Sequence, residues 1–307
     1  MRVYYGLEGF EPSSSRSALT IGNYDGVHRG HQEILAETVR LSRLAKVPAV
    51  VLTFEPHPLT IVSPDHAPQR LTSPEEKVAC LGRAGVDAVV LARSEPELLG
   101  LEAEEFVERV VHQRFHPVHI VEGESFGFGR GRRGNVQLLR RWAAEFNCAV
   151  HVVKPVEIAI DKERFVVSSS MVRRLLSEGD VHRTALCLGR PYALLGQVVH
   201  GAHRGRELGF PTANVTPEDQ LVPGEGVYAG IACVATGRFH AAISIGRSPT
   251  FSGDTVRVEA HLLDYSGDLY GQPIRLEFHR FLRAQRQFAS VDDLTHQIAA
   301  DIAAVRP

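Results

Sequence analysis

Two histidines three residues apart, His28 and His31, are the side chains of this sequence best placed to act on a phosphate. They follow an apolar run that ends at Gly22 and open an amphipathic segment, so the pattern predicts a strand, a tight turn and a helix N-terminus. Free backbone N–H groups and the helix dipole favour an anion there, and the spacing puts both imidazoles on one face. We therefore expect the pair to stabilise charge at an attacked phosphorus.

A zinc site is the alternative for this pair. Zinc needs further ligands, and no Cys or Glu-x-x-His partner stands at a useful spacing in the sequence. Gly30, between the two histidines, indicates close approach of the backbone to a ligand. The phosphate interpretation is therefore preferred.

A second stretch able to do chemistry lies in the C-terminal half and ends in Pro-Thr-Ala-Asn at residues 211–214. In an extended segment Thr212 and Asn214 point the same way, and their oxygens could hold one magnesium ion when phosphates supply negative charge. A loop that uses Pro211 and Asn214 as turn residues explains the same stretch. The residues alone leave both interpretations open.

The elements that must position the histidines alternate in type. Apolar runs recur between helical segments, the runs at 49–54, 88–92, 118–121 and 148–153 and the segments near 74–84, 101–113 and 134–146. This alternation predicts a parallel sheet covered by helices on both faces. Because ligands bind beyond the carboxyl ends of such strands, we expect the histidines and the segment Phe54–Pro58 at one edge of the sheet.

Two segments near this edge have a functional and a plainer interpretation. The glycine-rich loop 122–134 combines Phe126 and Phe128 with three arginines, which suits a planar aromatic ligand that carries phosphates. A solvated basic loop is the plainer alternative, and a nucleic-acid role is less favoured because the loop is short and the chain is not basic. For Phe54-Glu-Pro-His-Pro58 the residues alone favour a rigid turn held by two prolines over a ligand contact.

Further along, Ser168 or Ser169 can cap a helix whose first turn carries Arg173. Hydroxyls, helix amides and a guanidinium are good partners for a leaving pyrophosphate, although a capped helix with a surface arginine is the plainer interpretation. A last helix of this half ends at Gly189. We place the domain boundary near residue 186, which predicts domains at 1–186 and 187–307.

The second half changes character. Apolar or alternating runs are separated by turn signals and followed by one helix near 291–304, the runs lying at 194–199, 226–234, 240–245, 256–263 and 274–278. This pattern predicts an antiparallel barrel or sandwich closed by the helix. Glu259 shares a strand face with Arg257 and His261, so the strand pattern alone makes it one of several exposed polar residues.

The composition excludes some classes of protein. At 307 residues the chain can form two domains, and its formal charge of −2 gives no electrostatic reason to expect a nucleic-acid or membrane partner. No apolar run of 18 residues and no signal peptide is present, which favours a cytoplasmic location. The 4 cysteines are far apart, so we expect buried free thiols. A weak homo-oligomer stays open.

Residues 22–32, Gly-Asn-Tyr-Asp-Gly-Val-His-Arg-Gly-His-Gln, closely resemble the signature of bacterial bifunctional riboflavin kinase/FMN adenylyltransferases, or FAD synthetases. Similar stretches follow in family order at 54–58, 123–129, 167–173, 201–214, 226–229, 245–251 and 258–264. The resemblance spans roughly residues 17–305. It implies an N-terminal Rossmann-like nucleotidylyltransferase domain with a parallel sheet and a C-terminal antiparallel β-barrel riboflavin kinase domain with a terminal helix.

The resemblance also implies site residues. In the adenylyltransferase half, ATP would contact Gly22, Asn23, Asp25, His28, Gly30, His31, Ser169, Ser170 and Arg173, and the flavin would contact Phe54, Ser125, Phe126 and Phe128. In the kinase half, ATP would contact Gly201, Arg206, Gly209, Phe210, Pro211, Thr212 and Asn214. Magnesium would bind at Thr212 and Asn214, and Glu259 occupies the place of the catalytic base. His28 and His31 would be the catalytic residues of the first half.

The implied activity is the ATP-dependent conversion of riboflavin to FMN and of FMN to FAD, with riboflavin, FMN, FAD and ATP as small-molecule partners and Mg2+ as cofactor. The sequence departs from the family at Ser125, usually Asp or Asn, at Gly127, often Arg, and at Ser244, often Asn. Two alternatives stay open, of which the first follows from Ser125 and Gly127. One is a riboflavin kinase with a weak or inactive adenylyltransferase half, and the other is a non-enzymatic flavin-nucleotide sensor or carrier.

Overall fold

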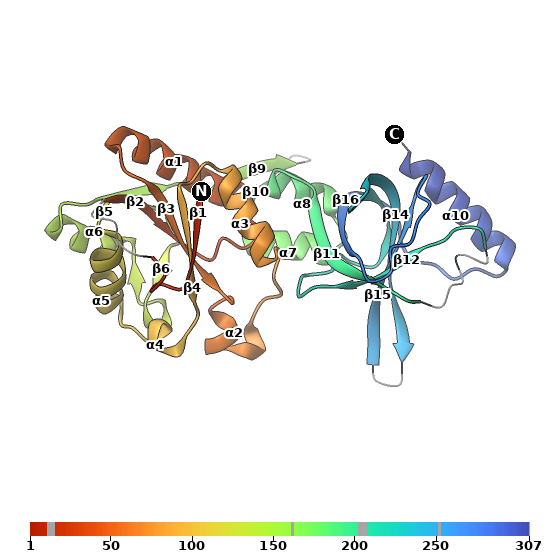
Figure 1. The fold of residues 1–307 in the computed structure, drawn as a ribbon, viewed down its shortest axis with the longest axis horizontal. Helices are drawn as coiled ribbons and strands as arrows, with labels where there is room; N and C mark the ends of the chain where they lie inside the picture. Colours follow the sequence, from red (N-terminus) through yellow and green to blue (C-terminus); the bar gives the residue numbers. More distant parts are fainter. Residues whose placement is uncertain (11–15, 161–162, 202–204, 206–207, 251–252, 307) are drawn as a thin grey trace. The chain divides into compact units, whose positions relative to one another are not determined.

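The computed structural model describes residues 1–10, 16–160, 163–201, 205, 208–250 and 253–306 (Figure 1). Internal contacts divide the chain into two compact units, one of Met1–Arg70 with Pro74–Ser168 and one of Leu71–Ser73 with Ser169–Pro307. Helices α7 (Ser169–Ser177) and α8 (Val181–Leu188) thus belong to the second unit, although α7 lies wholly and α8 mostly before the predicted boundary near residue 186. The physical reason is that α8 packs on barrel strands of that unit. The boundary near residue 186 stays a prediction.

The first unit is built on a parallel sheet, as predicted. Its strands, in spatial order, are β1 (Arg2–Tyr5), β4 (Ala88–Arg93), β3 (Ala49–Glu55), β2 (Ser17–Ile21), β5 (Pro117–Gly123) and β8 (Ala149–Val153). From β2 the chain adds β3 and β4 on one side and β5 and β8 on the other. The order therefore reverses between β2 and β5, and ligands bind at such a switch point in doubly wound sheets.

Helices cover both faces of this sheet, which confirms the predicted layering (Figure 1). Helices α1 (Arg29–Ala45) and α3 (Pro74–Arg83) bury Leu35 and Leu81 in the core of one face. On the other face, the π-helix η2 (Phe106–Phe115) and α6 (Val136–Glu145) cover the second core. The helix expected near 101–113 is therefore α5 (Ala103–Glu105) followed by π-helical turns.

Short elements complete the unit. They are α2 (Leu59–Val62), η1 (Pro64–His66), α4 (Pro96–Leu99), β6 (Gly127–Phe128), η3 (Arg130–Arg132), β7 (Gly134–Asn135), β9 (Glu157–Ile160) and β10 (Glu163–Val166). Cys80, Cys148 and Cys187 are buried and Cys233 is half-buried, and within the described residues these cysteines are not joined by a disulfide.

The second unit contains a closed antiparallel barrel, so the prediction of a barrel or sandwich resolves to a barrel. Around the ring, its strands are β11 (Tyr192–Val199), β12 (Ala213–Pro217), β15 (Gly253–Leu262), β14 (Gly237–Thr250), β13 (Gly226–Val234) and β16 (Pro273–Arg283). Alternate side chains, such as Ile243 and Val258, fill the interior. Tyr228 and Phe278 meet there edge to face, with ring centroids 5.3 Å apart.

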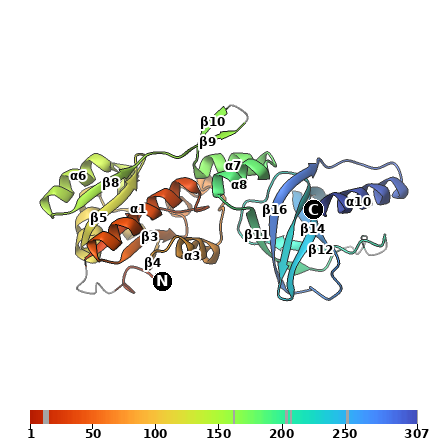
Figure 2. The ribbon, with the colours of Figure 1, turned by 90° about the horizontal axis from the view of Figure 1, so that it is seen from above.

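Helix α10 (Val291–Val305) packs on β13 and β14, and Figure 2 shows it beside β14 from a second side. Ser290 caps the helix by accepting the Asp293 N–H at 3.1 Å. Near its end, the buried Asp301 carboxylate accepts hydrogen bonds from Arg283 of β16, at 2.7 Å from Nη2 to Oδ2 and 3.0 Å from Nε to Oδ1. This ion pair anchors the terminal helix to the barrel.

Candidate functional sites

His28 and His31 lie at the carboxyl edge of the sheet, directly after β2. His28 is the N-cap of α1, and its Nδ1 accepts the His31 N–H at 3.3 Å. The two rings stack, with centroids 3.6 Å apart and planes 16° from parallel. The predicted strand, turn and helix are thus confirmed, and both imidazoles lie together at the positive end of the helix dipole.

The half-buried His31 is an uncharged imidazole at neutral pH. Burial, the neighbouring His28 and the ammonium of Lys77 lower the pKa of His31 well below its usual value of 6.5. Its buried Nδ1 has no hydrogen-bond partner within the part of the chain that the structure describes. A neutral ring at a helix N-terminus can donate to a phosphate without carrying a full charge.

Gly30 has a packing reason as well as the predicted ligand reason. A Cβ at this position would lie 3.2 Å from both Cε1 and Nδ1 of His28. Because Gly30 has no side chain, the His28 ring can occupy this position without being displaced. The sequence alone could not supply this reason, because it depends on how the ring is folded back over the first turn of the helix.

The segment after β3 meets the turn after β2, as the parallel sheet predicts. The Asn23 side-chain amide lies 3.0 Å from Nε2 of His57, whose Nδ1 accepts the Leu59 N–H at 3.2 Å. Phe54, half-buried at the end of β3, has its carbonyl bound by Nζ of Lys77 at 3.2 Å. Asn23 and Phe54, two predicted ligand contacts, are thus brought to one edge, with His57 and Lys77 as neighbours that the predicted site did not include.

The remaining predicted residues of this edge are Gly22 and Asp25. Gly22 lies at the start of the turn, where its N–H donates to Leu52 O at 3.0 Å. Asp25 is buried inside the turn, only 5% exposed. Both therefore lie within the turn that leads to the histidines, and their contacts with ATP stay predictions.

The two phenylalanines of the loop after β5 differ in their exposure to solvent. Phe128 is only 6% exposed and packs in the core of the unit, whereas the half-buried Phe126 stacks on it with centroids 5.3 Å apart. The exposed Ser125 uses its carbonyl to accept Nη2 of Arg132 at 3.1 Å. A Cβ at Gly127 would lie 3.2 Å from Nε of Arg132, so glycine leaves room for that guanidinium. Phe126 is thus the more accessible of the two rings.

Ser169, Ser170 and Arg173 lie on α7, which begins at Ser169. Ser170 is exposed, and the other two are half-buried. This helix belongs to the second unit and the histidine pair to the first. Their joint contact with one ATP molecule therefore stays a prediction.

In the barrel, polar residues of three neighbouring strands are in register. Glu259 of β15 stands opposite Asn214 of β12 on one side and opposite Ser244 of β14 on the other. Their sequence neighbours Ala213, Val258 and Ile245 are buried, so this row lies on the outer face. Glu259 is partly exposed, and Nη1 of Arg257 lies 3.9 Å from its Oε1. The row brings the predicted base next to one of the two predicted metal ligands.

Glycine backbone lies directly against the two predicted metal ligands. A Cβ at Gly201 would overlap the Asn214 amide, and a Cβ at Gly205 would come 3.1 Å from Oγ1 of Thr212. Pro211 is held to β15 because its carbonyl lies 2.7 Å from Nδ1 of His261.

The other predicted nucleotide contacts of the kinase half lie in the same segment. The Phe210 N–H donates to Gly205 O at 2.8 Å, and Gly209 takes a left-handed φ of 83°. Arg206 lies outside the described residues. Among the described residues no group of three His, Cys, Asp or Glu side chains could hold a metal, and the magnesium site at Thr212 and Asn214 stays a prediction.

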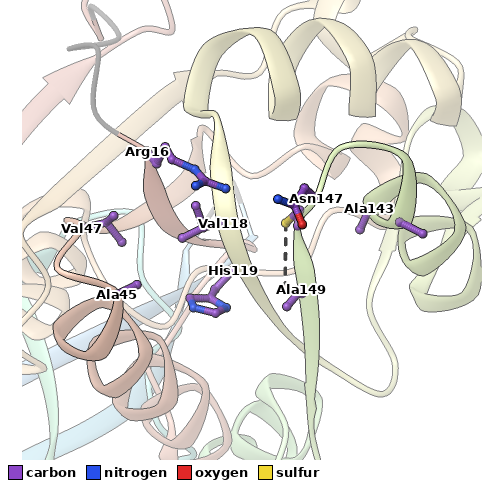
Figure 3. A pocket seen from close by; sticks show the side chains of 10 residues that line it. Arg16, Ala45, Val47, Val118, His119, Ala143, Asn147 and Ala149 are labelled. Carbon is purple, nitrogen blue, oxygen red and sulfur yellow. Dashed lines mark hydrogen bonds between the residues drawn. The ribbon is translucent and has the colours of Figure 1, made fainter.

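A separate cavity of about 500 Å³ lies elsewhere in the first unit, at the amino ends of β5 and β8. Figure 3 shows Arg16, His119 and Asn147 around it. The histidine pair follows β2 at the opposite, carboxyl edge of the sheet, so the cavity is not part of the predicted site. In the described chain, no helix is both long and apolar enough to cross a membrane.

Comparisons with known proteins agree with this arrangement. Residues 10–170 match the family model of FAD synthetase, and residues 188–307 match that of riboflavin kinase. A bifunctional riboflavin kinase/FMN adenylyltransferase of Pseudomonas fluorescens is 36% identical over 100% of this chain and 97% of its own. The protein of the same name from Escherichia coli K12 is 36% identical, over 98% of this chain and 96% of its own.

A crystal structure from Streptococcus pneumoniae, titled as a macrolide-efflux protein, shares the fold with a TM-score of 0.89 and 28% identity, over 100% of this chain and 99% of that one. Its likeness extends through both units. The family assignment itself comes from the two matched domain models and from the identity to relatives over their full length. The chain belongs to the bifunctional riboflavin kinase/FMN adenylyltransferase family.

Proposed function

We propose that this chain phosphorylates riboflavin to FMN in its second unit and adenylylates FMN to FAD in its first, consuming ATP in each reaction. The observation that carries the proposal is the presence of two separate polar constellations, the stacked pair His28 and His31 in one unit and the row containing Asn214 and Glu259 in the other. ATP and flavins are cytoplasmic metabolites, so we place the enzyme in the cytoplasm.

In the kinase reaction, Glu259 accepts the proton of the ribityl 5′-hydroxyl. The hydroxyl oxygen attacks the γ-phosphorus of ATP, and ADP leaves. Thr212 and Asn214 would hold Mg2+, because neutral oxygens backed by glycine backbone suit a hard cation that shares its charge with phosphates. Bound there, Mg2+ supplies charge neutralisation at the ATP phosphates. The chain's own contribution is to hold the base and the nucleotide in line.

In the adenylylation reaction, an oxygen of the FMN phosphate attacks the α-phosphorus of a second ATP and pyrophosphate leaves. A phosphate is already ionised at neutral pH, so this step needs no general base. His28 and His31 donate to the phosphate oxygens at the N-terminus of α1, and Ser169, Ser170 and Arg173 bind the leaving pyrophosphate. The flavin ring would contact Phe54 and Phe126, with Ser125 beside it and Phe128 supporting Phe126 from the core.

A second candidate function is that of a riboflavin kinase alone. The observation that favours it is the loop after β5, where Ser125 and Gly127 depart from the resemblance and Arg132 fills the space beside Gly127. Under this alternative, FMN supplied to the protein would not be converted to FAD.

The test uses two variants of the full chain. We expect Glu259→Ala to abolish conversion of riboflavin to FMN but leave adenylylation of supplied FMN intact. His28→Ala should do the reverse. Both reactions are followed by separating riboflavin, FMN and FAD chromatographically. Loss of both activities from either substitution would contradict two independent sites.

A further inference from the structure

At the switch point of the sheet, a side chain takes the place of a backbone partner. The ladder between β2 and β5 ends at the pair Leu19 and Ile120. The next N–H of β2 that faces β5, that of Ile21, donates instead to Oε1 of Glu122 at 2.8 Å. Glu122 is only 2% exposed. A buried carboxyl therefore fixes the last residue of β2, at the edge where the histidine pair lies.

The turn that follows β2 is strained. Tyr24 and Val27 have φ values of 49° and 39°, in the left-handed region that side chains other than glycine rarely adopt. For a β-branched residue such as Val27 this is an outlier, because its Cβ is crowded against the backbone in this region. Strain of this kind persists only where the surrounding structure holds it.

Tyr24 provides a second attachment of this turn. Its hydroxyl lies 2.5 Å from Oγ1 of Thr20 on β2, and its ring centroid lies 5.0 Å from that of His31. Tyr24 is only 2% exposed. The turn is thus fastened to β2 through Thr20, the end of β2 is fastened to β5 through Glu122, and His31 rests on the Tyr24 ring.

We propose that Glu122 and Tyr24 are positioning residues for adenylyl transfer. They hold the strained turn so that the stacked pair His28 and His31 keeps its place at the α-phosphorus, and neither residue needs to touch the substrate. This inference rests on the proposed function. It goes beyond it because it assigns a role to a buried carboxyl and a buried hydroxyl that the reaction itself does not use.

The protonation of Glu122 and its hydrogen bond to the Ile21 N–H decide which substitution should preserve the function. Burial raises the pKa of Glu122 well above 4.5, although the Ile21 N–H favours the charged form. Burial thus favours the uncharged form of the carboxyl, and Oε1 accepts the Ile21 N–H. A glutamine has a similar shape and also offers a carbonyl oxygen, whereas a leucine of similar size leaves the Ile21 N–H buried without a partner.

The experiment measures kcat and KM for FMN adenylylation in the full-length chain and in Glu122→Gln, Glu122→Leu and Tyr24→Phe. We expect Glu122→Leu to lower kcat about 10- to 100-fold with little change in KM, because misplaced catalytic groups lose rate in this range. Glu122→Gln should stay within about 3-fold of the wild type, and Tyr24→Phe, which keeps the ring, should lose about 3- to 10-fold. Riboflavin kinase activity of the same molecules serves as the internal control and should not change.

Three results would overturn the inference: an unimpaired Glu122→Leu, a Glu122→Gln as defective as Glu122→Leu, or an equal loss of kinase and adenylyltransferase activity in Glu122→Leu. The first means that the turn does not need the carboxyl, the second that its charge is used, and the third that the residue stabilises the chain as a whole. A wild-type chain that forms no FAD would refute the proposed function itself, and this inference with it.

Discussion

Replacing Gly30 by alanine should damage adenylylation without destabilising the protein. The added Cβ would lie 3.2 Å from Cε1 and Nδ1 of His28 and 3.6 Å from the Val167 carbonyl, so the ring must move by a few tenths of an ångström. The hydrogen bond from the His31 N–H to Nδ1 of His28 is already long at 3.3 Å, and such a shift would break it.

The Gly30→Ala substitution has two opposing effects on the free energy of unfolding, whereas its effect on the rate of adenylylation is not compensated. Loss of the N-cap costs about 1 kcal/mol of helix stability, and alanine in place of glycine returns up to about 1 kcal/mol. The free energy of unfolding should therefore change by less than about 1 kcal/mol. The misplaced His28 should lower kcat of adenylylation about tenfold, which corresponds to about 1.4 kcal/mol in the activation barrier.

The assay compares FAD formation from FMN and ATP with chemical denaturation of the same samples. Gly82→Ala is the matched control, because Gly82 is also helical and a Cβ there would meet only the flexible end of Met1, 3.1 Å from Cε. It should keep full activity. A Gly30→Ala protein with wild-type kcat, or a Gly82→Ala protein with the same loss, would refute this account of Gly30.

Three further predictions concern the barrel and the pH dependence of stability. The new Cβ of Gly201→Ala would push against the Asn214 amide and should lower the rate of riboflavin phosphorylation about 10- to 100-fold without affecting adenylylation of supplied FMN. An equal change of the two rates relative to the wild type would contradict this prediction. Asp301→Ala leaves Arg283 without its buried partner and should destabilise the barrel by about 3 kcal/mol, seen as a lower denaturation midpoint. Because the pKa of Glu122 is raised in the folded state, that state keeps a proton that the unfolded chain loses above pH 4.5, so stability falls as pH rises from there towards the raised pKa. Glu122→Gln removes this effect and should gain stability relative to the wild type by up to about 1.4 kcal/mol per pH unit in that window; a difference independent of pH would contradict it.

The sheet and the barrel were predictable because their signals are local. Continuous apolar runs such as 49–54 read as buried parallel strands, and alternating runs such as 256–263 read as strands with one solvated face. β1 (Arg2–Tyr5) carried no such signal, because it is a short edge strand with two exposed and two half-buried residues that is defined only by its pairing with β4. Closure into a barrel depends on pairing between β11 and β16, which are distant in sequence.

The site was predictable in its residue types and not in its supports. Their spacing identifies His28 and His31 as candidates, and the surrounding motifs identify Thr212, Asn214 and Glu259. The hydrogen bond between Ile21 and Glu122 joins residues 101 positions apart, so only the register of β2 and β5 reveals it. Glu122 directly follows the apolar run 118–121, where a carboxyl is expected to be exposed, and the sequence does not show that β5 continues through Gly123 and buries it.

Both reactions should take place in one chain, and a single time course can show this. The purified protein is supplied with riboflavin, ATP and Mg2+, and riboflavin, FMN and FAD are quantified separately. We predict that FMN rises first and that FAD then accumulates at its expense. FMN that persists, together with no FAD from supplied FMN, would contradict the claim and leave a riboflavin kinase alone.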